Sequence, residues 1–356
     1  MLFFISKYGH QACGQGEGNR MEWRSSALGW QGVDPYSEQV NTLRQQLVAK
    51  NGAASLTICE PDDYARIAEC FYRDGFVVVH SVITGEALHR LQADCDEVMV
   101  EIVNRDQAAR GNRGSHRYSF GSTSTTGAQL HHEGWFQLIE HPILNAIVRT
   151  LFQSEDYIVR SAGGDFCLPG AVDYQPLHSD MQDRTTHALP NGQTFVHGAF
   201  FDPEGLITYR DLPCPFIACN VLTCDITALN GATRQIPGTQ RSRDSIPSLA
   251  DEPEWMMHST VSPAPAGAVL IRDVRAWHGG TPNVSEDVRA IPNIEFYAPW
   301  FREPMRPCLR RSDFDRLSKA GQRRCRFIVE RDDSPLRIGY RDDLGYIPNP
   351  FLESGS

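Results

Sequence analysis

The chain has 356 residues, enough for one large domain with extensions or for two ordinary domains. Hydrophobic residues make up 41% and charged residues 22%, the balance of a globular protein. The formal net charge of -10 repels phosphate backbones, so nucleic acid is not an expected partner. No apolar run approaches the ~20 residues of a membrane span, so no membrane partner is expected either. The ten cysteines are scattered without a C-x-x-C pair, which favours reduced thiols and a cytoplasmic protein.

The first half of the chain predicts helices. Apolar residues at helical spacing, with a proline or a capping residue before them and a glycine after two of them, predict three helices. We expect these helices near residues 34–52, 61–75 and 84–102. The run Phe76-Val-Val-Val79 lies between the second and the third, and its β-branched residues predict a buried strand.

The pattern of apolar and polar residues changes after about residue 155. Short apolar runs, beginning at Tyr157, Phe216, Ala268 and Ile294, alternate with clusters of Gly, Pro, Asn and Asp. This rhythm is typical of an antiparallel β-sandwich or barrel and not of βαβ units. A further helix is predicted near residues 313–325.

These patterns divide the chain into three parts. We expect an extension with one helix over residues 1–55, a β-rich domain over 56–305 and a polar tail with one helix over 306–356. The tail is rich in arginine, and its interleaved acids favour a solvated face or a subunit contact over an anionic substrate site. The oligomeric state is not predicted.

The stretch Gln175-Pro-Leu-His178-Ser-Asp180 contains two candidate metal ligands. On a strand, residues two apart point to the same face, so an imidazole and a carboxylate would lie side by side. With a second histidine they would form a two-histidine, one-carboxylate triad, which binds Fe(II) and leaves positions open. The motif alone is weak, because His131-His132-Glu133 offers a rival H-x-E and spacing cannot choose between the two.

The second histidine is predicted at His278. It stands in Trp277-His278-Gly279-Gly280, after an apolar run, and therefore near the end of a strand. Arg289 follows at the start of another strand-like segment, from which its guanidinium could grip a carboxylate with two hydrogen bonds. A buried arginine needs an anionic partner, and a dicarboxylate chelated to the metal by its other end would supply one.

Four segments in order resemble the phytanoyl-CoA dioxygenase family of Fe(II)/2-oxoglutarate oxygenases, over roughly residues 70 to 300. Asp74-Gly-Phe-Val-Val-Val-His-Ser-Val82 is similar to its opening helix-to-strand element, and Pro176-Leu-His178-Ser-Asp180 to its metal motif. Asn230-Gly-Ala-Thr-Arg-Gln-Ile-Pro-Gly238 is similar to its glycine-rich hairpin, although Gln240 stands where histidine is common. His278 with Arg289 completes the set at the family's spacing.

The resemblance implies a mainly β fold with flanking helices, built on a double-stranded β-helix (a jelly-roll, cupin-like core). It implies that iron is held by His178, Asp180 and His278, and that Arg289 binds the far carboxylate of 2-oxoglutarate. Three further residues are candidate contacts of the co-substrate, and for each a purely structural hydrogen bond is the alternative. These residues are Gln175, Asn220 and Thr281.

The resemblance also implies the reaction. The co-substrates would be 2-oxoglutarate and O₂, the co-products succinate and CO₂, and the substrate a small organic metabolite. Asp180 is the carboxylate that related halogenases lack, so hydroxylation is favoured, with desaturation, epoxidation or ring closure as alternatives. Asn230-Gly-Ala-Thr-Arg234 resembles members from specialised metabolism. A cupin-like metal enzyme that does not use 2-oxoglutarate and a catalytically silent binding module are the competing classes.

The segment between the metal motif and the strand at Phe216 is long for a compact domain. It runs over residues 181–215 and contains Phe195, Phe200, Phe201 and Tyr209, too many aromatic residues for a disordered linker. Long loops of this kind are usually functional, so we predict a lid over the substrate. The alternative is an extra hairpin that only extends the sheet.

Overall fold

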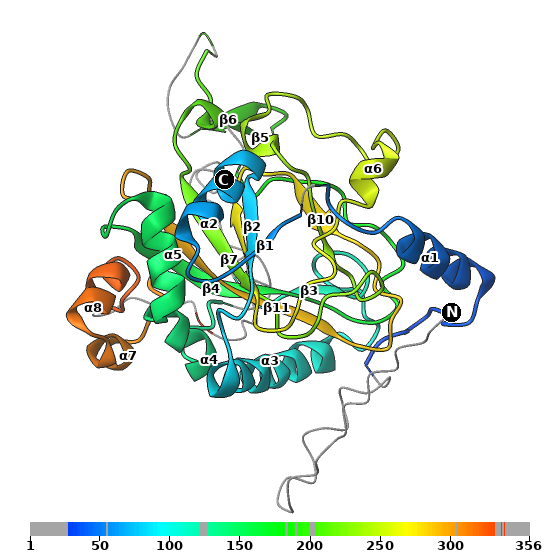
Figure 1. Ribbon diagram of the computed structural model, residues 1–356, viewed down its shortest axis with the longest axis horizontal. Coiled ribbons are helices and arrows are strands. Elements are labelled where there is room, and N and C mark those ends of the chain that lie inside the picture. The colour runs from blue at the N-terminus through cyan, green and yellow to red at the C-terminus, as the bar shows by residue number, and fades with distance from the viewer. Residues whose placement is uncertain are drawn as a thin grey trace, which may run out of the picture.

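The computed structural model places β-sheets at the centre of the molecule and helices around them (Figure 1). The structure describes residues 28–54, 56–121, 127–181, 184–188, 191–198, 204, 206–303, 305–331, 336 and 338. Within these residues, no helix combines the length and the apolar character needed to cross a membrane.

Eleven strands are present in the described residues. They are β1 (Ile58–Cys59), β2 (Phe76–Val79), β3 (Arg117–Ser119), β4 (Ile158–Cys167), β5 (Arg184–Ala188), β6 (Thr194–Gly198), β7 (Phe216–Val221), β8 (Thr233–Gln235), β9 (Val269–Asp273), β10 (His278–Gly280) and β11 (Arg289–Tyr297).

The helices lie mainly before β4 and after β11. They are α1 (Glu38–Ala49), α2 (Tyr64–Asp74), α3 (Gly85–Arg105), α4 (Glu133–Phe136), α5 (Pro142–Phe152), α6 (Glu254–Met257), α7 (Arg311–Arg316) and α8 (Lys319–Cys325), with the short 3-10 turns η2 (Gln137–Ile139), η3 (Tyr209–Asp211) and η4 (Thr239–Arg241). The three predicted N-terminal helices correspond to α1, α2 and α3. The prediction of one continuous helix near residues 313–325 is wrong. The side chain of Ser318 caps a second helix, α8, so the segment contains two helices.

Seven strands form one sheet in the order β1-β2-β9-β7-β11-β4-β3. All neighbours in it are antiparallel except β1 and β2. A second sheet consists of β8 and β10, and a third of β5 and β6. The mainly β core with helices around it agrees with the sequence expectation.

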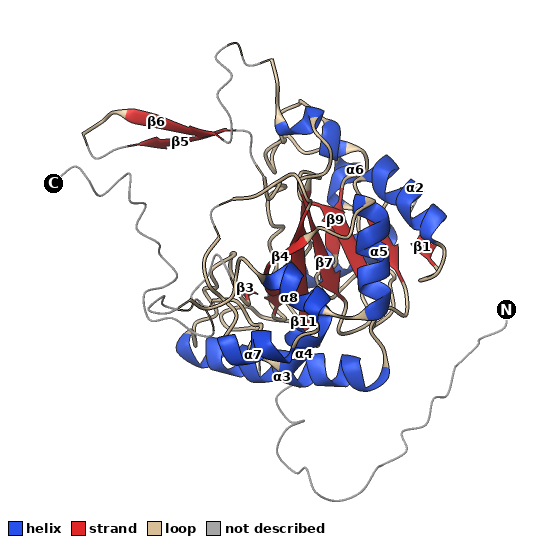
Figure 2. Cartoon of the chain, turned by 90° about the vertical axis from the view of Figure 1, so that its left-hand side faces the viewer, coloured by secondary structure: helices blue, strands red, loops and turns tan. Residues whose placement is uncertain are grey.

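The two faces of the seven-stranded sheet differ in chemistry, because side chains alternate along each strand. One face is apolar and packs against α2, α3, α4 and α5 in a single large cluster, with Ile271, Cys219 and Ile294 fully buried in it. Figure 2 shows α3 and α5 beside these strands. The opposite face presents Arg272 and Asn220 to a cavity that the second sheet also lines, through Thr233 and His278. The candidate site lies in this cavity.

Candidate active site

A pair of reciprocal backbone hydrogen bonds brings His178 and His278 together. Each residue's N–H donates to the other's carbonyl oxygen over 2.9 Å. Directly opposed residues of an antiparallel pair carry their side chains on the same face, so the two rings lie 4.2 Å apart. The prediction of a strand at the metal motif is wrong, since His178 forms only this isolated bridge. The extended backbone still places His178 and Asp180 on one side.

The hydrogen bonds of both rings prepare them for a metal. Nδ1 of His178 lies 3.0 Å from the carbonyl oxygen of Pro176, and Nδ1 of His278 lies 3.0 Å from that of Ala276. A carbonyl oxygen only accepts, so Nδ1 carries the proton and the lone pair of Nε2 is free. Burial also lowers the pKa of His278 well below its usual value, which keeps the ring neutral.

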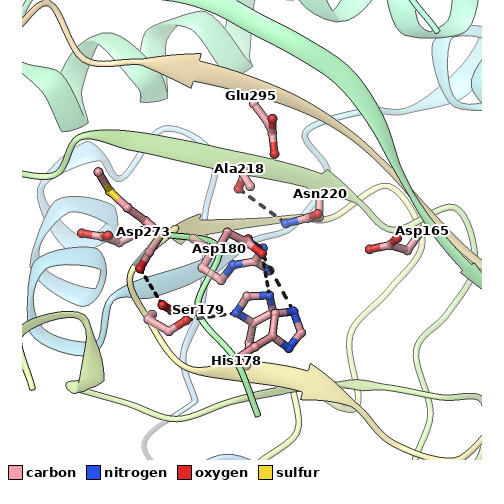
Figure 3. Close-up of polar contacts among 12 residues, drawn as sticks. Asp165, His178, Ser179, Asp180, Ala218, Asn220, Asp273 and Glu295 are labelled. Atoms are coloured by element: carbon pink, nitrogen blue, oxygen red, sulfur yellow. Dashed lines mark hydrogen bonds and ion pairs between the residues drawn. The ribbon is translucent and has the colours of Figure 1, made fainter. Parts of the chain in front are cut away.

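Asp180 completes the group (Figure 3). Its Oδ1 is 3.5 Å from Nε2 of His278 and 3.9 Å from Nε2 of His178. An ion with bonds of about 2.1 Å can join atoms up to about 4.2 Å apart, so one ion can reach all of these atoms. Two imidazoles and one carboxylate are the donor set of a facial Fe(II) site. The three residues therefore fit an iron ion.

The carboxylate of Asp180 is held in its charged form. Burial would raise its pKa, but His278, Arg272 and His178 together hold the pKa well below its usual range. Arg272 is charged at every relevant pH, whereas burial keeps His278 neutral. Nη2 of Arg272 donates to Oδ2 of Asp180 over 2.5 Å, so this ion pair is the main cause.

The triad opens into a cavity of about 370 Å³ between the two sheets. That volume lies in the usual range of small-molecule sites. The lining includes all three triad residues together with Arg289, Gln175 and Asn220, but not Thr281. The structure therefore brings three of the four predicted co-substrate contacts to the metal group.

Arg289 is the buried cation of this cavity. It is 4% exposed, and its Nε donates to the carbonyl oxygen of Gly231 over 3.0 Å. Its Nη1 is buried and has no hydrogen-bond partner among the described residues. Burial lowers the pKa of the guanidinium. A buried donor without a partner is costly, and an anion bound in the cavity would satisfy it.

The other three predicted contacts differ from one another. Gln175 accepts a hydrogen bond from the N–H of Gly280 through Oε1, which orients its amide beside the triad. Asn220 donates through Nδ2 to the carbonyl oxygen of Leu270 over 3.3 Å and faces the cavity. Thr281 is fully buried, and its hydroxyl donates to the carbonyl oxygen of Ala232. Thr281 therefore makes a purely structural hydrogen bond, which was the alternative to a contact with the co-substrate.

Sequence reasoning missed Arg117, a second cation of the cavity. Arg117 lies on β3 and is 5% exposed, and its Nη2 donates to the carbonyl oxygens of Asp173 and Thr281. A Cβ on Gly280 would lie 2.5 Å from Nη1 of Arg117, so a larger residue there would displace this guanidinium. The glycine that follows the second histidine is the indication of a crowded position in the sequence. It does not show which distant residue occupies the space beside it.

A second missed group lies on β4 and β11. Arg160 forms a hydrogen-bonded ion pair with Glu295, and both line the cavity. Nε of Arg160 also donates to the hydroxyl of Tyr297 over 2.9 Å, and its guanidinium lies 5.1 Å from the centre of the Phe216 ring. In the sequence, Glu295 is an acidic residue within an apolar run. The sequence does not show that this run pairs with β4, which carries Arg160.

The rival motif does not form a metal group. Glu133 pairs with Arg316 of α7, and burial lowers the pKa of His131 to about 4. Only His132 lies near other possible ligands, the carboxylates of Asp94 and Glu97 on α3. His131 and Glu133 are absent from that group, so the H-x-E pair of the sequence is not assembled.

The segment 181–215 contains a hairpin. Strands β5 and β6 pair only with each other in the described residues and do not extend the seven-stranded sheet. Figure 2 shows this hairpin standing away from the helices and the main sheet. Phe200 and Phe201 lie outside the described residues. Tyr209 is buried, and its carbonyl oxygen accepts from Nη1 of Arg275, which fixes the end of the segment beside β9.

A sheet core whose cavity joins a two-histidine, one-carboxylate group to a buried arginine defines the class of non-haem iron dioxygenases that use 2-oxoglutarate. The family model described as phytanoyl-CoA dioxygenase matches residues 71–291. The chain belongs to the phytanoyl-CoA dioxygenase family, and its cofactors are iron, 2-oxoglutarate and O₂.

Curated proteins that are similar to this chain include two dioxygenases. Dioxygenase FrzG of Cladobotryum sp. is 26% identical over 240 residues, which cover 62% of this chain and 70% of that protein. Dioxygenase trt7 of Aspergillus terreus is 24% identical over 226 residues, covering 62% and 69%. Among solved structures, HygX of Streptomyces hygroscopicus with nickel, 2-oxoglutarate and hygromycin B bound has a TM-score of 0.47 at 15% identity, covering 68% of this chain and 90% of that one.

Proposed function

We propose that this enzyme hydroxylates a small, polar organic metabolite, with succinate and CO₂ as co-products. In this proposal His178, Asp180 and His278 hold the iron, and Arg289 binds the far carboxylate of 2-oxoglutarate. The observation that supports it best is the unpaired Nη1 of Arg289 in the same cavity as the triad. A guanidinium in that position matches a dicarboxylate whose other end chelates the metal.

The proposed core is a jelly-roll, in which the seven-stranded sheet faces the β8–β10 pair across the cavity. Residues 56–305 would form this domain, with residues 1–55 and 306–356 as extensions. A rigid pair of sheets suits the reaction, because the ligands stand on backbone that is already hydrogen-bonded. The isolated bridge between His178 and His278 then joins the metal motif to the smaller sheet.

When bound, iron supplies the oxidising chemistry with 2-oxoglutarate and O₂, and the protein supplies orientation. Arg289 and Arg117 offer positive charge to an anionic co-substrate, and Gln175 offers its amide beside the first histidine. The backbone carbonyls behind both histidines fix each ring in one tautomer.

The substrate is proposed to carry hydrogen-bonding groups. At the end of β11 away from Arg289, the cavity is lined by Asn293, Glu295 and Arg160. Figure 3 shows the Glu295 carboxylate pointing toward the metal group. A hydrocarbon chain there would displace water from these groups and offer none of them a hydrogen bond, at a cost of about 1–3 kcal/mol for each polar atom left without a partner. The resemblance of Asn230-Gly-Ala-Thr-Arg234 supports specialised metabolism as the setting.

Succinate formation tests the proposed reaction. Purified protein with Fe(II), 2-oxoglutarate and O₂ is expected to form succinate slowly without substrate, and the Arg289→Ala variant far more slowly. Oxygen uptake that does not depend on 2-oxoglutarate would instead support the cupin-like alternative. No turnover by a protein that binds Fe(II) would support the silent binding module.

Isotope labelling tests the outcome on the substrate. Metabolite extracts incubated with the enzyme under ¹⁸O₂ are expected to yield a product that has gained one labelled oxygen atom. A product that has lost two hydrogen atoms and gained no oxygen would indicate desaturation or ring closure. A product that has gained one labelled oxygen, and that takes up one molecule of water to form a diol when a three-membered ring is opened, would indicate epoxidation.

A further inference from the structure

The two oxygens of the Asp180 carboxylate have different partners. Oδ1 faces the histidines, 3.5 Å and 3.9 Å from their Nε2 atoms. Oδ2 accepts a hydrogen bond from Nη2 of Arg272 over 2.5 Å. An oxygen that is bonded to a guanidinium is poorly placed to bind a metal as well, so the carboxylate can offer one oxygen only.

Arg272 occupies a rigid position. It lies in β9, paired with Ala218 of β7 on one side and with Phe76 of β2 on the other. Its side chain is 8% exposed and points to the cavity, whereas the preceding Ile271 is fully buried on the helix side. The strand therefore aims this guanidinium at the metal group from the centre of the sheet.

Asp180 itself lies in no strand and depends on β9 for its position. Its N–H donates to the carbonyl oxygen of Val274, just after β9, over 2.9 Å. The bond from Arg272 is a second link to the same strand, made this time by the side chain. Nε of Arg272 is buried without a hydrogen-bond partner in the described residues, so Asp180 is the main partner of the guanidinium.

We propose that Arg272 is a positioning residue that restricts Asp180 to metal binding through a single oxygen. This inference rests on the proposed metal site. A carboxylate can bind a metal through one or both oxygens, and the second bond would occupy a position that 2-oxoglutarate or O₂ needs. The ion pair keeps that position open, and it also fixes the direction of Oδ1 before the metal arrives.

The test uses cobalt(II) in the metal-free protein without O₂, so that no turnover is needed. Arg272→Met keeps an unbranched, flexible side chain that fills most of the same space, and removes its charge and donors. At saturating cobalt we expect a changed visible absorption spectrum, which reports a changed coordination, and a loss of 2-oxoglutarate affinity of about 10-fold or more. Arg272→Lys, which keeps the charge but not the planar fork, is expected to give an intermediate spectrum and affinity.

The adjacent residue supplies the control. Ile271→Ala disturbs the same strand from its other face, and it should lower stability without changing the cobalt spectrum or the 2-oxoglutarate affinity. If Arg272→Met does not fold, the Lys variant decides, since a purely structural role would leave its spectrum unchanged. Wild-type spectrum and affinity in both folded variants would overturn the inference. Failure of the wild-type protein to bind cobalt through the triad would overturn the proposed metal site first, and this inference with it.

Discussion

The two faces of the seven-stranded sheet carry side chains with different roles. On β11, Ile294 and Phe296 pack into the helix-covered cluster, while Asn293 and Glu295, which alternate with them, face the cavity. These residues follow one another along the same hydrogen-bonded strand. Only the direction of the side chain separates a residue that stabilises the fold from one that can bind a ligand.

The cavity face bears charges that would be costly in the apolar cluster. Arg289, Arg272 and Arg160 all line it, and each is tied to a carbonyl or a carboxylate. The helix face gains its free energy from close packing, so it tolerates neither a charge nor a void. We therefore expect substitutions on the cavity face to change binding, and substitutions on the helix face to change stability.

The largest effect is expected at the triad. His278→Ala should abolish binding of iron or cobalt at micromolar concentration, because it removes one of three donors. Stability without metal should change little, since the ring lies at the cavity and not in the helix-side cluster. Isothermal titration of the metal and thermal unfolding measure the two quantities. His131→Ala is the control, and loss of metal in that variant would mean that the rival motif is the site.

The next effect concerns Arg289. Arg289→Ala should weaken 2-oxoglutarate binding by at least ~100-fold, since losing one partner of a buried charged pair costs about 3–5 kcal/mol. Metal affinity should stay close to that of the wild type. Titration of cobalt into the metal-free protein gives the metal affinity, and titration of 2-oxoglutarate into the cobalt-loaded protein gives the co-substrate affinity. An unchanged affinity for the co-substrate would show that this arginine does not bind it.

The sharpest comparison uses two neighbours on β11. Ile294→Ala should lower the free energy of unfolding by about 2–5 kcal/mol, because it leaves a void in the helix-side cluster. Glu295→Gln should lower stability less than Ile294→Ala, because the amide oxygen can still accept from Arg160 and Glu303 keeps a carboxylate near that guanidinium. It should instead alter turnover of the substrate. Chemical denaturation and product formation distinguish the two. Equal effects of both substitutions on stability would contradict the division between the faces.

The smallest effect is expected at the segment 181–215. If it closes over the substrate, limited proteolysis within it should slow a few-fold when 2-oxoglutarate and substrate are both bound. Replacing Phe200 and Phe201 with Ala should spare 2-oxoglutarate decarboxylation without substrate but reduce turnover of the substrate. Equal cleavage rates with and without substrate would leave β5 and β6 as a hairpin without a gating role.

Local patterns in the sequence were sufficient for the three N-terminal helices and for several of the long strands, but not for α5 or the short strands. Helix α2 ends at Gly75 because that residue adopts a left-handed conformation, φ 81°, which glycine reaches without cost. The four buried residues of β2 were readable as a β-branched run. The structure brings together the three predicted ligands, His178, Asp180 and His278, which the sequence offered through an H-x-D pair and a histidine followed by Arg289 in the order of the family.

Tertiary structure alone decided which polar residues meet in the cavity. Arg272, Arg117 and Arg160 come from three different strands, and nothing in their local sequence separates them from arginines of the surface. Thr281 stands in the sequence where a contact with the co-substrate was expected, yet its hydroxyl donates a hydrogen bond to a backbone carbonyl oxygen. Spacing along the chain fixes which face of a strand a residue occupies, but only strand pairing fixes what lies opposite that face.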